Sequence, residues 1–244
     1  MWWARPQQIY VGTGRVLVPA AGGGARRESI EQHRCDPGQE EVLVERLLRE
    51  RPARRTRLFL ANGLIRFQSV PRIAGIWRQI ERTRAAMRLA RLDPAQWEGC
   101  VEDPSLESAW LLCALHRERR SKLASLRDRT GGRIEMIAAY SAVVASGIRV
   151  RGDTPSLVAI LEGEDLAWVV RTASSLRAAG QVRGIDAGDI GDEVERLAMA
   201  NGVPAGRRYV FALEADGEAE TQQHAEMRGL PLRSIVRVVE GASP

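Results

Sequence analysis

The amino-acid sequence predicts an α/β fold divided into two lobes, and three observations support this class. Each half of the chain opens with two apolar segments joined by a short glycine-containing turn, at residues 8–19 and 156–171. In each half, apolar segments then alternate with amphipathic helical segments, which is typical of mixed sheets flanked by helices. The segment between the halves, RVRGDTP at 149–155, is charged and contains glycine and proline, as interdomain linkers often do. We therefore expect a first lobe at 1–150 and a smaller second lobe at 151–244.

The first lobe should begin with three strands, at 8–13, 15–19 and 29–35. A glycine-rich connector, AAGGGARR, separates the second strand from the third. Pro37 then starts a short helix, and Pro52 closes it.

A buried strand, RTRLFLA, follows this helix at 55–61. The next two residues, Asn62 and Gly63, are typical of a two-residue β-turn, so we expect a hairpin here. The following strand, LIRFQSVP, should end at Pro71, because proline cannot donate to a ladder.

The rest of the first lobe should alternate helices with apolar segments. Apolar residues among arginines predict a long helix over 74–92, with Trp77 as its anchor in the core. SAWLLCALH, at 108–116, reads as a strand buried on both faces. The basic segment 116–129 has Leu123 and Leu126 on one helical face, which favours a solvated amphipathic helix over a phosphate-binding stripe. A strand and a short Ala-rich helix ending at Gly147 should close the lobe.

The second lobe should follow the same plan. A hairpin around a Gly-Glu-Asp turn opens it at 156–171, and one or two strands follow near 176–185. A helix over 189–202 is expected, with Asp189 or Asp192 as its cap and Gly202 at its end. Two strands, in RRYVFALEADG and LRSIVRVVEG, should complete the sheet.

Composition favours a soluble cytoplasmic protein. The 244 residues are 44% hydrophobic and 27% charged, the N-terminus does not resemble a signal peptide, and no apolar run is long enough to span a bilayer. Trp2 and Trp3 are expected in a loosely ordered start, with insertion into a membrane interface or a partner pocket as the alternative. The three cysteines, at positions 35, 100 and 113, show no CxxC spacing and are expected to be buried free thiols.

Familiar catalytic motifs are absent from the sequence. There is no GxxxxGK[ST], since Lys122 is the only lysine, and there is no GxSxG or HExxH. The histidines, His33, His116 and His224, are expected at the surface or at strand ends. The sequence therefore offers no metal site and no catalytic residue of these classes.

The turn VGTGR remains, with an apolar strand on each side. Gly12, Thr13, Gly14 and Arg15 in this context resemble the first phosphate loop of the actin-like superfamily, whose lobes are ribonuclease H-like. The whole chain is similar to the actin-like cytoplasmic proteins of type IV pilus and type II secretion machines, of the PilM type and the GspL type. The segments RRTRLFLANGLIRFQSVP, GGRIEMIAAYSAVVASG and SLVAILEGEDLAWVVR carry this resemblance, in the family's order.

The sequence departs from the superfamily where a nucleotide would bind. ATP-hydrolysing members have an acidic residue before the first glycine turn, because the metal on the phosphates needs a hard oxygen ligand. Tyr10 stands at this position, and Ala159, Ile160 and Leu161 stand where the second loop would have aspartate and glycine. We therefore interpret residues 12–15 as a vestigial phosphate loop whose glycines supply positive φ to a tight turn. Neither a cofactor nor a metal is expected, although ATP is what such a fold would suggest.

The resemblance implies a non-catalytic cytoplasmic scaffold at the inner membrane. It would bind a membrane-spanning assembly protein or the secretion ATPase, would reach the membrane only through that partner, and could form a homodimer. The reduced second lobe and the absence of a terminal membrane helix favour the PilM type.

Two other functions stay open from the sequence. The first is a divergent ATPase or kinase in which residues 12–15 contact phosphate and Asp186, Asp189 or Glu162 holds the metal. The second is a nucleic-acid binder, suggested by the isoelectric point near 9.7, although an aromatic content of 5% gives few platforms for base stacking. We expect no nucleic-acid partner.

Overall fold

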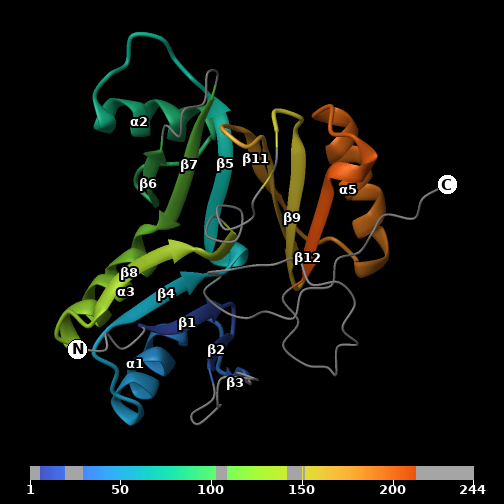
Figure 1. The fold of residues 1–244 in the computed structure, drawn as a ribbon. Helices are drawn as coiled ribbons and strands as arrows, with labels where there is room; N and C mark the ends of the chain where they lie inside the picture. Colours follow the sequence, from blue (N-terminus) through green and yellow to red (C-terminus); the bar gives the residue numbers. More distant parts are fainter. Residues whose placement is uncertain (1–5, 20–29, 103–108, 142–149, 151, 213–244) are drawn as a thin grey trace.

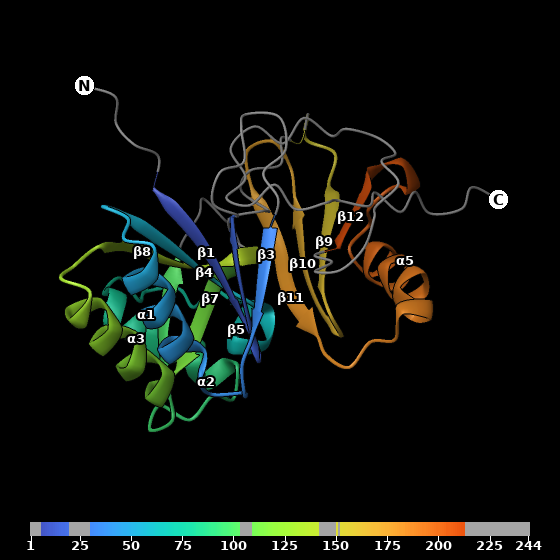
Figure 2. The same cartoon turned by 90° about the horizontal axis from the view of Figure 1, so that it is seen from below.

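Three β-sheets form the framework of the part of the chain that the computed structural model describes, which is residues 6–19, 30–102, 109–141, 150 and 152–212 (Figure 1). Helices cover the outer faces of these sheets (Figure 2). The mixed α/β class that the sequence predicts is confirmed.

The first sheet has the strand order β3-β2-β1-β4-β8. Its strands are β1 (Gln7–Gly12), β2 (Arg15–Pro19), β3 (Ile30–Arg34), β4 (Thr56–Leu60) and β8 (Ile134–Ala139). Strands β1, β2 and β3 are antiparallel, whereas β4 runs parallel to both β1 and β8. Helices α1 (Glu40–Glu50) and α3 (Arg117–Arg129) lie side by side on its outer face (Figure 2). Leu123 and Leu126 of α3 are buried there, as the sequence predicts.

The second sheet is built from β5 (Ile65–Pro71), β6 (Trp97–Glu102) and β7 (Ala109–His116), with β7 in the centre. Helix α2 (Gln79–Leu89) packs on it through Ala86 and Met87. Strand β6 was not predicted, because its sequence WEGCVE contains too few apolar residues to stand out.

The third sheet has the order β11-β10-β9-β12. Its strands are β9 (Ser156–Glu162), β10 (Asp165–Arg171), β11 (Leu176–Val182) and β12 (Arg208–Ala212), and helix α5 (Ile190–Ala200) covers its outer face. Short 3-10 turns at Ala187–Asp189 and Ala205–Arg207 flank α5. The first and third sheets share one plan, because each starts with a hairpin whose first strand pairs in parallel with the strand after a helix.

The sheets contact one another directly. Leu17 and Phe59 of the first sheet share one buried cluster with Val158, Ile160 and Phe211 of the third. Strands β5 and β11 also lie side by side (Figure 1), where the Ser69 hydroxyl donates to the Ala179 carbonyl at 3.2 Å and accepts from the Ala179 N–H at 3.1 Å.

Two predicted features are wrong. Asn62 and Gly63 do not form a hairpin but begin a 3-10 turn, Asn62–Leu64, because β4 pairs with β1 and β8 while β5 crosses to the second sheet. Trp77 does not anchor the core: it precedes α2, which begins only at Gln79, and 74% of it is exposed.

Some predictions lie outside the described residues. These are the Ala-rich helix ending at Gly147, the strand LRSIVRVVEG, the two N-terminal tryptophans and His224. Among the helices that are described, none combines the length and apolar character that crossing a bilayer requires.

Candidate functional site

The candidate site is the packed interface between the β1–β2 hairpin and the β9–β10 hairpin, where Tyr10, Val158 and Ile160 are all buried; we call this interface the crevice. Side chains alternate between the two faces of a strand, so Ile9 and Val11 point to the helices of the first sheet while Tyr10 points to the crevice. In β9, Val158 and Ile160 point to the crevice in the same way, and Glu162 follows them on that face. The period of two thus brings one phenol and one carboxylate together.

Tyr10 and Glu162 are joined by a buried hydrogen bond. The phenolic hydroxyl donates to Oε2 of Glu162 at 2.8 Å, and the backbone N–H of Asn62 donates to the same oxygen at 2.8 Å. Tyr10 is fully buried and also contacts the ring of Tyr140 edge-on, at 5.2 Å between centroids. This contact fills the crevice at the position before the first glycine turn.

The titration of this pair is shifted by its surroundings. Burial raises the pKa of Glu162 to about 7, and the hydrogen bonds from Asn62 and Tyr10 and the charge of Arg15 only partly oppose that effect. Burial, followed by the nearby charge of Glu162, raises the pKa of Tyr10 well above its ordinary value. The phenol therefore stays protonated and acts as a donor.

The turns of both hairpins meet at Gly63. A Cβ atom at this residue would lie 2.7 Å from Oδ2 of Asp165, the first residue of β10, and 3.1 Å from Oγ1 of Thr13 in the β1–β2 turn. A side chain at residue 63 would therefore have to displace Asp165 and Thr13, which gives the glycine of the Asn-Gly pair a role here without a hairpin.

The predicted vestigial loop, residues 12–15, lies beside Tyr10 and Gly63 at this interface. Gly14 has a φ of +67°, as expected for a tight turn, but Gly12 is not in the left-handed region. A Cβ at Gly12 would instead lie 3.1 Å from Cγ of Arg15 and 3.1 Å from Cε1 of Tyr10, so crowding accounts for this glycine. The expectation that both glycines supply positive φ is therefore wrong for Gly12.

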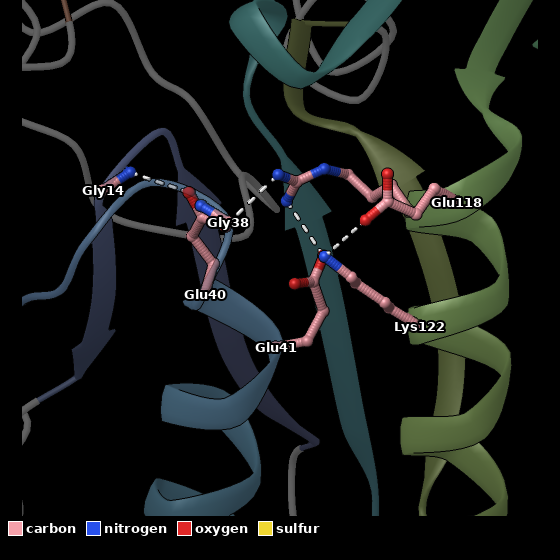
Figure 3. Close-up of polar contacts among 7 residues, drawn as sticks. Gly14, Gly38, Glu40, Glu41, Glu118 and Lys122 are labelled. Carbon is pink, nitrogen blue, oxygen red and sulfur yellow. Dashed lines mark hydrogen bonds and ion pairs between the residues drawn. The ribbon is translucent and has the colours of Figure 1, made fainter.

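The backbone N–H of Gly14 is bound by a carboxylate of the protein itself (Figure 3). It donates to Oε1 of Glu40 at 2.9 Å, while Oε2 accepts from the N–H of Gly38 at 2.9 Å and lies 3.2 Å from Nη2 of Arg119. Nη1 of Arg119 donates to Glu41 at 2.9 Å. Glu40 is fully buried, so an internal anion already holds the amide that a phosphate loop would offer to a ligand.

The charge of Glu40 is stabilised in this position. Burial, the largest single effect, would raise the pKa of its carboxyl, but the N–H groups of Gly14 and Gly38 and the charge of Arg119 outweigh it and lower the pKa. Sequence alone gives no sign of this role, because Glu40 and Arg119 occur in helical segments rich in ordinary acidic and basic residues.

The three carboxylates that the sequence suggests for a metal, Asp186, Asp189 and Glu162, do not lie together in one site. Glu162 lies in the crevice, but Asp186 precedes and Asp189 ends the 3-10 turn before α5, on the side of the third sheet that packs against that helix. Across the described ranges, no group of three His, Cys, Asp or Glu side chains is placed to hold a metal ion. A tyrosine and a single carboxylate that already accepts two hydrogen bonds do not fit a magnesium nucleotide.

A second concave feature is a pocket of about 570 Å³ between the second sheet, α3 and β8. Leu60, Ile65, Leu115 and Leu123 contribute apolar walls. Charged residues of both signs also line it, namely Glu98, Arg120, Arg127 and Asp128.

Two of the three cysteines line this same pocket. Cys100 of β6 and Cys113 of β7 are directly opposed in the ladder. Cys100 is exposed, and the thiols of Cys113 and Cys35 are half-buried, so the expectation of buried thiols is wrong. His116 lies at the end of β7, as predicted, while His33 lies half-buried within β3.

Comparison with known proteins identifies the fold. No protein-family profile matches the chain, and no curated protein sequence matches it. Among solved structures, a Bacteroides thetaiotaomicron protein with an actin-like ATPase fold and unknown function matches with a TM-score of 0.56 and 7% identity, over 87% of this chain and 83% of that one. The chain therefore has an actin-like fold.

Two further matching structures come from the two machines that the sequence analysis names, the type II secretion system and the type IV pilus. The cytoplasmic domain of EpsL, an inner-membrane component of the type II secretion system of Vibrio cholerae, matches with a TM-score of 0.49 and 17% identity, over 89% of this chain and 86% of that one. A PilM–PilN type IV pilus biogenesis complex matches with a TM-score of 0.44 and 12% identity, over 82% and 66%.

Proposed function

We propose that the chain is a non-catalytic cytoplasmic scaffold of a type IV pilus or type II secretion assembly platform in the inner membrane. In this role it binds a membrane-spanning partner, the secretion ATPase or both. The observation that carries the proposal is the buried contact between Tyr10 and Glu162, which occupies the crevice between the two actin-like hairpins. The sequence resemblance supplies the class of machine.

The chemistry of the crevice supports binding without turnover. A phenol that stays protonated cannot replace the carboxylate that coordinates magnesium, and Glu162 would repel the phosphates of a nucleotide when ionised. Glu40 holds the Gly14 amide, so a phosphate at this turn would have to displace a carboxylate that is also paired with Arg119. We accordingly propose residues 12–15 as a vestigial phosphate loop and the region near residue 150 as the boundary between the lobes.

We assign the partner segment to the pocket between the second sheet, α3 and β8. Its volume of about 570 Å³ lies within the range of pockets that bind ligands of a few side chains. Apolar walls can bury the anchors of a short peptide, while Arg120 and Glu98, themselves joined at 3.0 Å, offer charges at its rim. The occupant that we propose is the cytoplasmic segment of a membrane-spanning assembly protein.

The proposal is tested with a labelled peptide chosen from the cytoplasmic segments of the single-pass membrane proteins of the same organism. Fluorescence anisotropy measures its affinity for the whole protein and for two matched variants of α3. Ala124 lines the pocket, and its neighbour Ser125 is exposed outside it. Ala124→Trp should fill the pocket and weaken binding at least about tenfold, whereas Ser125→Trp should change it less than about twofold.

The pocket also contains its own chemical probe. A bound peptide should slow maleimide labelling of Cys100 and leave that of Cys35, which lies outside the pocket, unchanged. Absence of peptide binding, or equal weakening by both tryptophan variants, would overturn the assignment.

A further inference from the structure

The segment that joins β5 to α2 and continues through that helix presents apolar side chains to solvent. Trp77 is 74% exposed, Ile80 is 59% exposed and Ile73 is 39% exposed. They lie within eight positions of one another in the sequence. These three are among the few large apolar side chains that the described part of the chain leaves exposed, and nothing in the core requires them to be apolar.

The same segment carries a concentrated positive charge. Residues 71–92 contain six arginines and one acid, Glu81, and so have a net charge of +5, which equals the net charge of the whole chain. Arg78, Arg84 and Arg88 are exposed. We call this segment the basic rim.

The fold turns one side of α2 inward and the other outward. Ala86 and Met87 are buried against the second sheet, and the side chain of Gln79 donates to the carbonyl of Val101 in β6. Helical spacing then places Ile80, Arg84 and Arg88 one turn apart on a single exposed side. The preceding loop is braced by Arg82, whose Nε donates to the carbonyl of Ile76 at 3.1 Å.

The basic rim lies at one end of the molecule. In Figure 1, the chain between β5 and α2 arches outward at the top of the second sheet, and α2 lies at that same end. A projecting edge can meet a flat surface without obstruction from the other sheets.

We propose that the basic rim, residues 71–92, docks on the surface of an anionic phospholipid bilayer. Tryptophan and isoleucine can enter the boundary between headgroups and acyl chains, while exposed arginines around them pair with lipid phosphates. An acidic protein would complement the charge too, but the rim is a projection rather than a groove, which suits a planar partner better than a peptide. This contact would bring the chain to the membrane directly, whereas the sequence resemblance implies contact only through a partner, and it does not depend on the proposed scaffold role.

The test is sedimentation of the whole protein with vesicles of phosphatidylcholine alone or with about 30% phosphatidylglycerol. The protein should bind only the anionic vesicles, and raising the salt from about 50 to about 500 mM should weaken binding severalfold. Arg84→Glu with Arg88→Glu should lower the partition coefficient at least about tenfold. The control pair is Arg46→Glu with Arg49→Glu, which changes the charge equally on exposed residues of α1 and should have less than about a threefold effect.

A second pair of variants tests the contribution of apolar side chains to vesicle binding. Trp77→Ala should weaken binding to anionic vesicles severalfold, whereas Met199→Ala, at a residue of α5 that is 67% exposed, should not. The proposal is overturned if the wild-type protein stays in solution with anionic vesicles, or if it binds only an acidic peptide. Equal losses from the α1 and α2 charge reversals would overturn it as well, because they would indicate an effect of net charge alone.

Discussion

The phenolic oxygen of Tyr10 lies 2.8 Å from Oε2 of Glu162, a residue 152 positions later in the sequence, so a hydrogen bond joins the first hairpins of two sheets. Both partners are buried, and the N–H of Asn62 completes the arrangement. The sequence resemblance implies a nucleotide site between these hairpins. In our proposal, this internal contact takes the place of the nucleotide.

Removal of the Tyr10 hydroxyl should destabilise the protein without altering its fold. In Tyr10→Phe, the buried Glu162 loses one of its two donors, which should lower the free energy of unfolding by about 1–3 kcal/mol. Urea unfolding measures this change. Tyr209→Phe, at a half-buried residue of β12, is the control and should change stability by less than about 0.5 kcal/mol. Equal effects of the two variants would contradict the importance of the contact.

The stability should depend on pH through Glu162. Its pKa is raised from 4.5 to about 7 in the folded state. The stabilisation from its protonated form is therefore fully present below about pH 4.5. As the pH rises from about 4.5 to about 7, the unfolded state ionises first and about 3 kcal/mol of this stabilisation is lost. Glu162→Gln does not titrate and should lack this decline. If the free energy of unfolding changes with pH in the same way for the wild type and the variant, the pKa of Glu162 is not raised in the folded state.

Glu40 should be a major determinant of stability. Glu40→Ala removes the acceptor of two backbone N–H groups and one partner of Arg119, which should cost about 3 kcal/mol. Glu50→Ala removes an exposed carboxylate at the end of the same helix and should cost less than about 1 kcal/mol. The comparison uses chemical denaturation at neutral pH, and a cost of Glu40→Ala no larger than that of the control would contradict this role.

Glu40 should also make the stability depend on pH in the acid range. Its contribution is lost as the pH falls, whereas that of Glu162 is lost as the pH rises. The pKa of Glu40 is lowered in the folded state, so the stabilisation from its charge is present above the ordinary carboxyl pKa and is lost as the pH falls through the lowered value. Glu40→Gln should flatten this loss, which is read from unfolding curves between about pH 5 and pH 2. If Glu40→Gln loses stability as steeply as the wild type when the pH falls, Glu40 is not charged in the folded state.

Two tryptophans should differ sharply in their contribution to stability. Trp77→Ala should change the free energy of unfolding by less than about 0.5 kcal/mol, because most of this side chain is exposed. Trp110→Ala should cost about 3–5 kcal/mol, since Trp110 is fully buried in the cluster under α2. Thermal or urea unfolding distinguishes them, and a large loss from Trp77→Ala would restore the core role that the sequence suggested.

The pattern of apolar residues was sufficient to predict the alternation of strands and helices. Both hairpins were predicted, because β1–β2 and β9–β10 pair strands that are adjacent in sequence around glycine turns. The helix over Ile190–Ala200 was predicted as well, since it has apolar residues at helical spacing and Gly202 in the left-handed region after its end.

The errors arose where tertiary pairing overrides a local signal. Asn62-Gly63 is a strong hairpin dipeptide, yet β4 is already flanked by β1 and β8, so β5 has to pair elsewhere. Trp77 fits the period of a helix, but that helix begins two residues later and buries a different side. Periodicity indicates which face is apolar, not whether a partner within the chain covers it.

The candidate site was predictable only in part. The replacement of an acid by Tyr10 was visible in the sequence, but its partner was not, because pairing with Glu162 depends on how two sheets face each other. The same applies to Glu40, whose contacts with Gly14 and Arg119 join three separate segments.

The central claim is that the crevice holds an internal contact instead of a nucleotide, and isothermal titration of the whole protein with MgATP tests it most directly. We predict no heat beyond dilution at nucleotide concentrations up to about 1 mM. Saturable binding in the micromolar range that disappears when magnesium is chelated would contradict the account.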